Sequence, residues 1–131
     1  MKQVSRNKDK GTPLERYVKS FFHAIDGIVY SIRYEHNMII IILAAILCVI
    51  AGITLKISPS EWLFCILVIG MVMGAELINT SIEAVIDLET TKIHPLAKIA
   101  KDAASGATLI FSIIALIGGL IIFLPKLICL F

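Results

Sequence analysis

Charged side chains are scarce in this sequence. Asp, Glu, Lys and Arg make up 17% of its 131 residues, whereas 58% are hydrophobic and the mean hydropathy is +0.92. A soluble domain of this length has too small an interior to bury so much apolar surface. The chain is therefore interpreted as an integral membrane protein, and its formal net charge of +2 is too small to favour nucleic-acid binding.

Several familiar sequence signals are missing as well. We expect no cleavable signal peptide, because the first apolar run starts too late and no small-residue cleavage pattern follows it. Cys48, Cys65 and Cys129 fall in apolar runs without ligand spacing, which argues against a disulfide framework or a metal site. The sequence contains neither a G-x-x-x-x-G-K-[ST] phosphate-binding loop nor a protein-kinase catalytic loop, which excludes the soluble folds that use them.

Three apolar runs, each long enough to cross a bilayer, dominate what the sequence does contain. They predict an all-α membrane protein with transmembrane helices at about 37–55, 62–88 and 103–125. Ser60 is a candidate N-cap for the second of these helices.

The amino-terminal part of the chain has a different pattern. Residues 1–12 are polar and basic, so we expect a flexible tail before a single membrane domain at 13–131. Thr12 and Glu15 have capping-box spacing around a proline, which predicts the start of a helix. Over residues 13–34, apolar side chains recur at helical spacing between charged ones, which predicts an amphipathic helix in the membrane interface. The same pattern also fits a helix that packs against the bundle.

The distribution of basic residues predicts the orientation. Ten of the twelve lie in the first 35 residues or in the segment 89–102, and only Lys56 and Lys126 lie elsewhere. Because cytoplasmic loops carry the excess of Lys and Arg, the amino terminus and the segment 89–102 are expected in the cytoplasm. Three spans then place the carboxyl terminus outside.

One stripe of the second predicted span is polar. At about 100° per residue, its members fall within one third of the helix circumference: Glu76, Asn79, Thr80, Glu83 and Asp87. Ionisable groups at membrane depth are costly, and as a rule they face a bundle interior or water and serve a function. The aligned carboxylates and amide therefore indicate a metal site or a proton-transfer site.

The acidic residues are expected at different depths. Glu76 follows Glu61 by 15 residues, or roughly 22 Å of helix in a hydrocarbon core about 30 Å thick. This places Glu76 roughly 8 Å below the inner boundary and Glu83 near that boundary. Glu35, at the end of the amphipathic helix, reaches the same surface. Charged residues also approach it from a third segment, namely Lys98, Lys101 and Asp102.

These residue types suit a particular chemistry. Two carboxylates at an interface can hold Mg²⁺, and a deeper carboxylate can accept a proton from a hydroxyl group. Lys and Arg can neutralise phosphate charge. The combination fits phosphoryl transfer to a lipid alcohol, but from the residues alone a small proton- or ion-conducting subunit is a comparable alternative.

Two motifs resemble those of a known family. The segment E-L-I-N-T-S-I-E-A-V-I-D at 76–87 resembles the signature E-x-x-N-[ST]-x-I-E-x-x-x-D of the small prokaryotic diacylglycerol kinase family. The segment H-P-L-A-K-I-A-K-D-A-A-S-G-A at 94–107 resembles the second block of that family. Upstream, the family's amino-terminal block is matched by Arg16, Gly27 and Glu35.

The resemblance implies an enzyme and an assembly. It implies a homotrimer of three-span subunits, each with an amphipathic surface helix, and composite active sites at the subunit interfaces. By motif position, Glu76 is implied to be the catalytic base that acts on the lipid hydroxyl. Glu35 and Glu83 are implied to hold the Mg²⁺ that bridges the phosphates of ATP.

Further site residues follow from the same resemblance. Those implied to bind ATP are Arg16, His23, Asn79, His94, Lys101 and Asp102. Those implied to contact the lipid substrate are Glu76 and Ser105.

The resemblance also bears on the substrate. The amino-acid sequences of the segments 94–102 and Glu35-His36-Asn37 resemble those of Gram-positive members of the family, many of which phosphorylate undecaprenol. We therefore expect a multi-pass protein of a bacterial cell membrane that converts undecaprenol to undecaprenyl phosphate. The alternative is a diacylglycerol kinase that produces phosphatidic acid. The sequence departs from the usual form of those members at Ala104-Ser105 and at His23, where some have Tyr.

Overall fold

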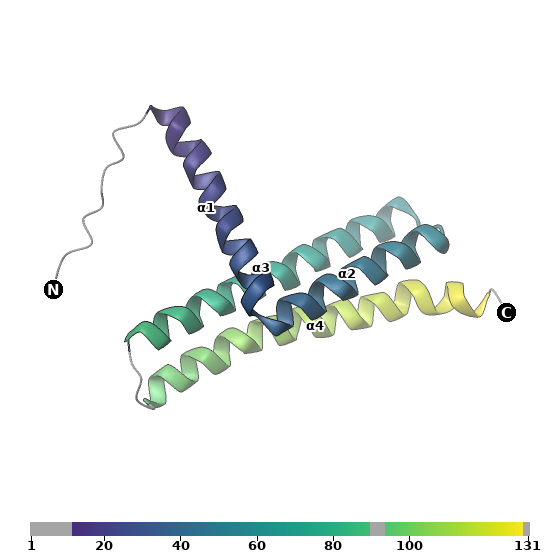
Figure 1. Cartoon of the computed structure of the whole chain (residues 1–131). Coiled ribbons are helices and arrows are strands. Elements are labelled where there is room, and N and C mark those ends of the chain that lie inside the picture. Colours follow the sequence, from purple (N-terminus) through teal and green to yellow (C-terminus); the bar gives the residue numbers. More distant parts are fainter. Residues whose placement is uncertain (1–11, 90–93, 130–131) are drawn as a thin grey trace.

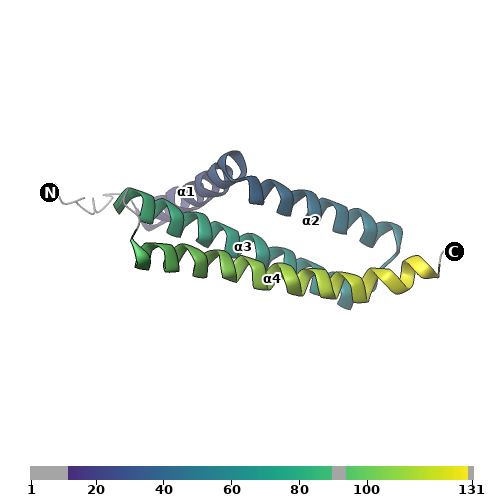
Figure 2. The same ribbon diagram turned by 90° about the horizontal axis from the view of Figure 1, so that it is seen from below.

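The computed structural model describes residues 12–89 and 94–129, and all of its regular structure is helical. Its elements are α1 (Pro13–Tyr34), α2 (His36–Thr54), α3 (Pro59–Glu89) and α4 (Pro95–Ile128). Figure 1 shows α2, α3 and α4 as an elongated bundle from which α1 departs at a steep angle. In the perpendicular view of Figure 2 the same three helices again run side by side.

Three of the helices can cross a membrane. The helices α2, α3 and α4 are long and apolar enough to do so, with 19, 31 and 34 residues. This confirms the prediction of an all-α protein with three candidate spans. The third predicted span lies inside α4, which starts eight residues earlier, at Pro95. The prediction followed only the apolar run, whereas the helix continues through charged residues that precede it.

Two helices begin with the same capping arrangement. At the start of α1, the Thr12 N–H donates to Glu15 Oε2 (3.0 Å) and the Glu15 N–H donates to Thr12 Oγ1 (3.4 Å). At the start of α3, the Ser58 N–H donates to Glu61 Oε2 (2.6 Å) and the Glu61 N–H donates to Ser58 Oγ (3.3 Å). The cap of α3 is therefore Ser58, and the expectation of Ser60 as the cap is wrong.

The helix α1 makes little contact with the rest of its own chain. Of its residues, Ser31 alone is buried, and large apolar side chains such as Tyr17 and Phe21 are exposed. The chain turns from α1 into α2 at Glu35, whose extended backbone donates its N–H to Ser31 O (2.9 Å). The apolar side chains of α1 are therefore available to a membrane surface or to another subunit.

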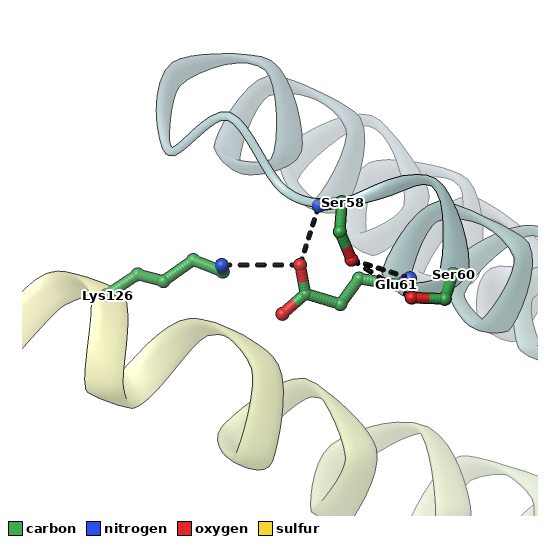
Figure 3. Close-up of polar contacts among 4 residues, drawn as sticks. All are labelled: Ser58, Ser60, Glu61 and Lys126. Atoms are coloured by element: carbon green, nitrogen blue, oxygen red, sulfur yellow. Dashed lines mark hydrogen bonds and ion pairs between the residues drawn. The ribbon is translucent and has the colours of Figure 1, made fainter.

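The helices α3 and α4 form an antiparallel pair that is fastened at the end near the α2–α3 turn. There Lys126 Nζ lies 3.2 Å from Glu61 Oε2, the oxygen that also accepts the Ser58 N–H (Figure 3). Nearby, Gly118 allows close approach, because an added Cβ would lie 2.1 Å from Phe64 Cζ. These contacts fix how α3 and α4 align along their length.

Candidate active site

The polar stripe of α3 changes from buried to exposed along the helix. Glu76, Asn79 and Thr80 have exposed fractions of 1%, 5% and 7%, whereas Glu83 is half-buried and Asp87 is exposed. Side chains that recur every three or four residues share one face of a helix. The stripe therefore faces the interior of the bundle over its first part and reaches the surface at its end.

An amide joins the stripe to α4. Asn79 Nδ2 donates to Glu83 Oε1 (3.1 Å), and Asn79 Oδ1 accepts a hydrogen bond from Ser105 Oγ (3.3 Å). The structure thus brings three of the predicted site residues together in one chain of hydrogen bonds. The hydrogen bond from Asn79 also orients the carboxylate of Glu83.

An ion pair occupies the exposed end of the stripe, and a second ion pair lies within α4. Lys101 Nζ lies 2.5 Å from Asp87 Oδ1, and Lys98 pairs with Asp102 on the same helix. Both residues that the resemblance assigns to the nucleotide from this part of α4 are therefore paired within the protein. Exposed pairs of this kind contribute little to stability, so a phosphate group can replace the carboxylate partner of Lys101.

Buried oxygens without a partner mark the inner part of the site. Within the described segments, Glu76 Oε1, Thr80 Oγ1 and Thr108 Oγ1 are buried and have no hydrogen-bond partner. Thr108 was not predicted from the sequence. The available signal was its position three residues after Ser105, which places both on one face of α4.

Glu35 lies apart in the sequence, at the break between α1 and α2, and its side chain is half-buried. The residues placed by the structure contain no group of three or more His, Cys, Asp and Glu side chains able to hold a metal ion. A site made by Glu35 and Glu83 alone would leave most of the coordination shell to phosphates and water, which is the usual arrangement for Mg²⁺.

The other residues predicted to bind ATP either lie away from the stripe or cap a helix. Arg16 and His23 lie in the amino-terminal half of α1, which points away from the bundle (Figure 1). His23 is highly exposed, with its Nδ1 3.9 Å from Asp26 Oδ2. His94 caps α4, because its Nδ1 accepts the Leu96 N–H (3.2 Å). One chain therefore does not bring Arg16 and His23 to the buried stripe.

Two cavities of the bundle are separate from the predicted site. One, of about 520 Å³, lies at the end near the α2–α3 turn and is lined by Thr54, Leu55, Lys56, Pro125, Lys126 and Cys129. The other, of about 560 Å³, is an apolar groove along α3 and α4, lined by Met71, Gly74, Ala75, Ile78, Ile82, Ala100, Ala103, Ala104, Ala107 and Phe111. No predicted site residue lines either cavity.

Comparisons with known proteins agree on one family. The model of the family described as "Prokaryotic diacylglycerol kinase" matches residues 22–123. The undecaprenol kinase of Bacillus subtilis (strain 168) is 47% identical over 121 residues, which cover 92% of this chain and 98% of that protein. A diacylglycerol kinase of Helicobacter pylori (strain J99) is 37% identical over 101 residues, which cover 77% and 79%. The family match includes the whole polar stripe of α3.

Proposed function

The chain belongs to the prokaryotic diacylglycerol kinase family, and on this premise we propose that it phosphorylates undecaprenol at the cytoplasmic face of a bacterial membrane. Family membership makes it a lipid kinase and decides against the ion-conducting alternative. The observation that carries the undecaprenol assignment is the 47% identity to an undecaprenol kinase over 92% of the chain. Diacylglycerol is the second candidate, because several relatives of 37% identity or less are diacylglycerol kinases.

The proposed chemistry centres on Glu76. Its carboxylate, 1% exposed and with one oxygen unpartnered within the described part of the chain, accepts the proton of the lipid hydroxyl. The hydroxyl oxygen forms a bond to the γ-phosphorus of ATP, the bond from that phosphorus to the β,γ-bridging oxygen breaks, and ADP leaves. The proton on Glu76 passes to water before the next turnover.

The carboxylates of Glu35 and Glu83 are the proposed Mg²⁺ ligands. Both are half-buried and offer the hard oxygen atoms that this ion prefers, and the hydrogen bond from Asn79 holds the Glu83 carboxylate in a fixed orientation. The bound ion supplies neutralisation of phosphate charge and alignment of the transferred group. These carboxylates bind and orient, whereas Glu76 handles the proton.

Cationic and polar side chains complete the proposed nucleotide site. The ammonium group of Lys101 leaves Asp87 to neutralise a phosphate, and the amide of Asn79 helps to position the γ-phosphoryl group. Further contacts to ATP come from Arg16, His23, His94 and Asp102. Ser105, which now donates to Asn79, lies beside the lipid headgroup.

The proposed assembly is a homotrimer with composite sites. Its support is the exposed apolar face of α1 and the apolar groove along α3 and α4, which one chain leaves uncovered. The amino terminus lies in the cytoplasm, as the distribution of basic residues predicts, and α1 lies in the membrane interface.

A substrate comparison tests the proposal. Purified protein in lipid bicelles is given radiolabelled Mg-ATP with either undecaprenol or diacylglycerol at equal mole fraction. We expect labelled undecaprenyl phosphate. Diacylglycerol is either not labelled or is labelled with a lower kcat/KM than undecaprenol. A higher kcat/KM for diacylglycerol would replace undecaprenol by the second candidate, and no label in either lipid would overturn the lipid kinase assignment.

A further inference from the structure

Three buried oxygens lack hydrogen bonds in the middle of the bundle. Among the residues that the structure describes, Glu76 Oε1, Thr80 Oγ1 and Thr108 Oγ1 are buried without a partner. Glu76 and Thr80 are more than nine-tenths buried. Buried polar groups are normally paired, because an unpaired one destabilises the folded state. The described part of one chain leaves these three oxygens without a polar partner, so they are available to a bound group.

Two other hydroxyl side chains of this chain form a hydrogen bond within their own helix. Thr54 Oγ1 and Ser81 Oγ each donate to the carbonyl oxygen four residues earlier, at 3.0 Å and 2.8 Å. This is the usual solution for a hydroxyl within a helix in an apolar environment. Thr80 and Thr108 do not adopt it, so their hydroxyl groups are free to contact something else.

The alignment of α3 with α4 places Thr108 opposite Glu76. Ser105 on α4 donates to Asn79 on α3, and the two helices are antiparallel and adjacent in both views (Figures 1 and 2). Three residues further along α4 is Thr108, and three residues earlier along α3 is Glu76. A step of three residues keeps a side chain on the same face of a helix. Thr108 and Glu76 thus lie at the same level along the contact between α3 and α4.

We propose that Thr108 binds the acceptor hydroxyl of the lipid substrate beside Glu76, an inference that rests on the proposed lipid kinase function. An alcohol has one proton and two lone pairs. Its O–H donates to Glu76 Oε1, and its oxygen accepts a hydrogen bond from Thr108 Oγ1. The second lone pair remains free to attack the γ-phosphorus.

The surroundings fit an alcohol better than an ion. The three oxygens belong to one carboxylate and two hydroxyl groups, and none of the ion pairs found in the described part of the chain includes Glu76. Thr80, one helical turn beyond Glu76, can donate to the other lone pair of Glu76 Oε1 once the alcohol is in place. Although its Oγ1 atom is buried, the Thr108 side chain as a whole is only half-buried, so the contact between α3 and α4 reaches the bundle surface there.

The test removes one hydroxyl without changing side-chain volume. Thr108→Val is compared with Thr108→Ser, which keeps the hydroxyl, and with Thr54→Val, which removes a hydroxyl that the helix already satisfies. For Thr108→Val we expect kcat/KM for the lipid alcohol to fall roughly threefold to tenfold, the size of one hydrogen bond. The KM for Mg-ATP stays unchanged. Thr54→Val keeps a lipid kcat/KM within about twofold of the unaltered protein, and Thr108→Ser retains more of the lipid kcat/KM than Thr108→Val does.

A second readout does not depend on turnover. The lipid alcohol is expected to raise the melting temperature of the unaltered protein and of Thr108→Ser without ATP, but to raise that of Thr108→Val less. The melting temperature of ligand-free Thr108→Val should be equal or higher, because an unpaired buried hydroxyl is gone.

Each contrary outcome has a distinct meaning. If the unaltered protein phosphorylates a lipid alcohol and Thr108→Val matches it in lipid kcat/KM, the inference is wrong while the proposed function stands. If Thr108→Val instead lowers ligand-free stability and weakens ATP and lipid use alike, the hydroxyl is structural and the inference is also wrong. If the unaltered protein phosphorylates no long-chain alcohol, the proposed function and the inference fall together.

Discussion

Glu76 and Glu83 lie two helical turns apart on α3, in different surroundings. Glu76 is almost fully enclosed, whereas Glu83 is half-buried and accepts a hydrogen bond from Asn79. Bringing a hydrated ion to the enclosed carboxylate would be costly, but an alcohol can enter such a place. The same side-chain chemistry therefore supports a proton acceptor at one depth and a metal ligand at the other.

Substitution by glutamine should separate these two roles. We expect Glu76→Gln to lower kcat about 10²- to 10⁴-fold while the Kd for Mg-ATP changes little, because a base acts in the transition state. Glu35→Gln and Glu83→Gln should weaken Mg-ATP binding and raise the Mg²⁺ concentration needed for half-maximal rate. Calorimetry gives the Kd for Mg-ATP. A titration of the rate with magnesium gives the Mg²⁺ concentration needed for half-maximal rate. Near-normal turnover of Glu76→Gln, or a changed magnesium dependence in that variant alone, would require the roles on α3 to be exchanged.

The pair formed by Lys101 and Asp87 gives a second prediction at the scale of residues. Lys101→Met should raise the KM for ATP roughly tenfold, because a charge-assisted contact to phosphate is lost. Asp87→Asn should leave that KM unchanged or lower it, since Lys101 no longer has to leave a carboxylate. Steady-state kinetics with ATP varied at saturating lipid measures both variants. A larger rise in KM for Asp87→Asn than for Lys101→Met would show that Asp87, and not Lys101, serves the nucleotide.

The residues of the site were predictable to different degrees. The stripe from Glu76 to Asp87 follows from helical spacing, which is a local property of the sequence, and the structure shows its inner half buried. The pairing of Asp87 with Lys101 and the position of Thr108 opposite Glu76 depend on how α3 and α4 align. That alignment is set by contacts distant in sequence, and no local pattern contains it.

Helix boundaries in this chain are set by capping chemistry more than by hydrophobicity. Both α1 and α3 begin with a hydroxyl residue, a proline, any residue and a glutamate, and each hydroxyl and glutamate exchange hydrogen bonds with the backbone. The predicted spans followed apolar runs and therefore began too late at α3 and α4. The capping signal was present in the sequence at Ser58 and Glu61, and it would have placed the start of α3 correctly.

A capping variant tests this assignment at the scale of a helix. Ser58→Ala should lower the free energy of unfolding by about 1 kcal/mol, because the Glu61 N–H loses its side-chain acceptor. Ser60→Ala, the matched control one position past the proline, should lower it less, since the Ser60 hydroxyl group shares a hydrogen bond with the Ser58 hydroxyl group and not with the Glu61 N–H (Figure 3). Denaturation in detergent with helicity as the signal gives both values. An equal or larger loss for Ser60→Ala would return the cap to Ser60.

At the scale of the molecule, one chain holds only part of the proposed site. The hydrogen-bonded group of Asn79, Glu83 and Ser105 is complete within the α3–α4 pair. Arg16, in contrast, lies on the part of α1 that points away from the bundle (Figure 1). A helix that exposes its apolar side chains and carries a predicted nucleotide contact is suited to complete the site of a neighbouring chain. Spacing within one sequence could not predict this proposed arrangement, because it would depend on contacts between chains.

Mixing two defective variants tests whether sites are shared between chains. Glu76→Gln removes the base, and Arg16→Ala removes the predicted contact on α1, so each pure preparation should be slow at low ATP. Trimers are then assembled from equal amounts of both variants. A shared site is intact when the chain that supplies Glu76 carries Arg16→Ala and the chain that supplies Arg16 carries Glu76→Gln. This is true of about one quarter of sites. Activity at low ATP should then exceed the mean of the two pure preparations and approach about one quarter of the unaltered rate. Mixing the proteins after assembly, without subunit exchange, is the control. If co-assembled samples give only the mean of the pure preparations, Arg16 and Glu76 serve the same chain, and α1 must fold back onto its own bundle during catalysis.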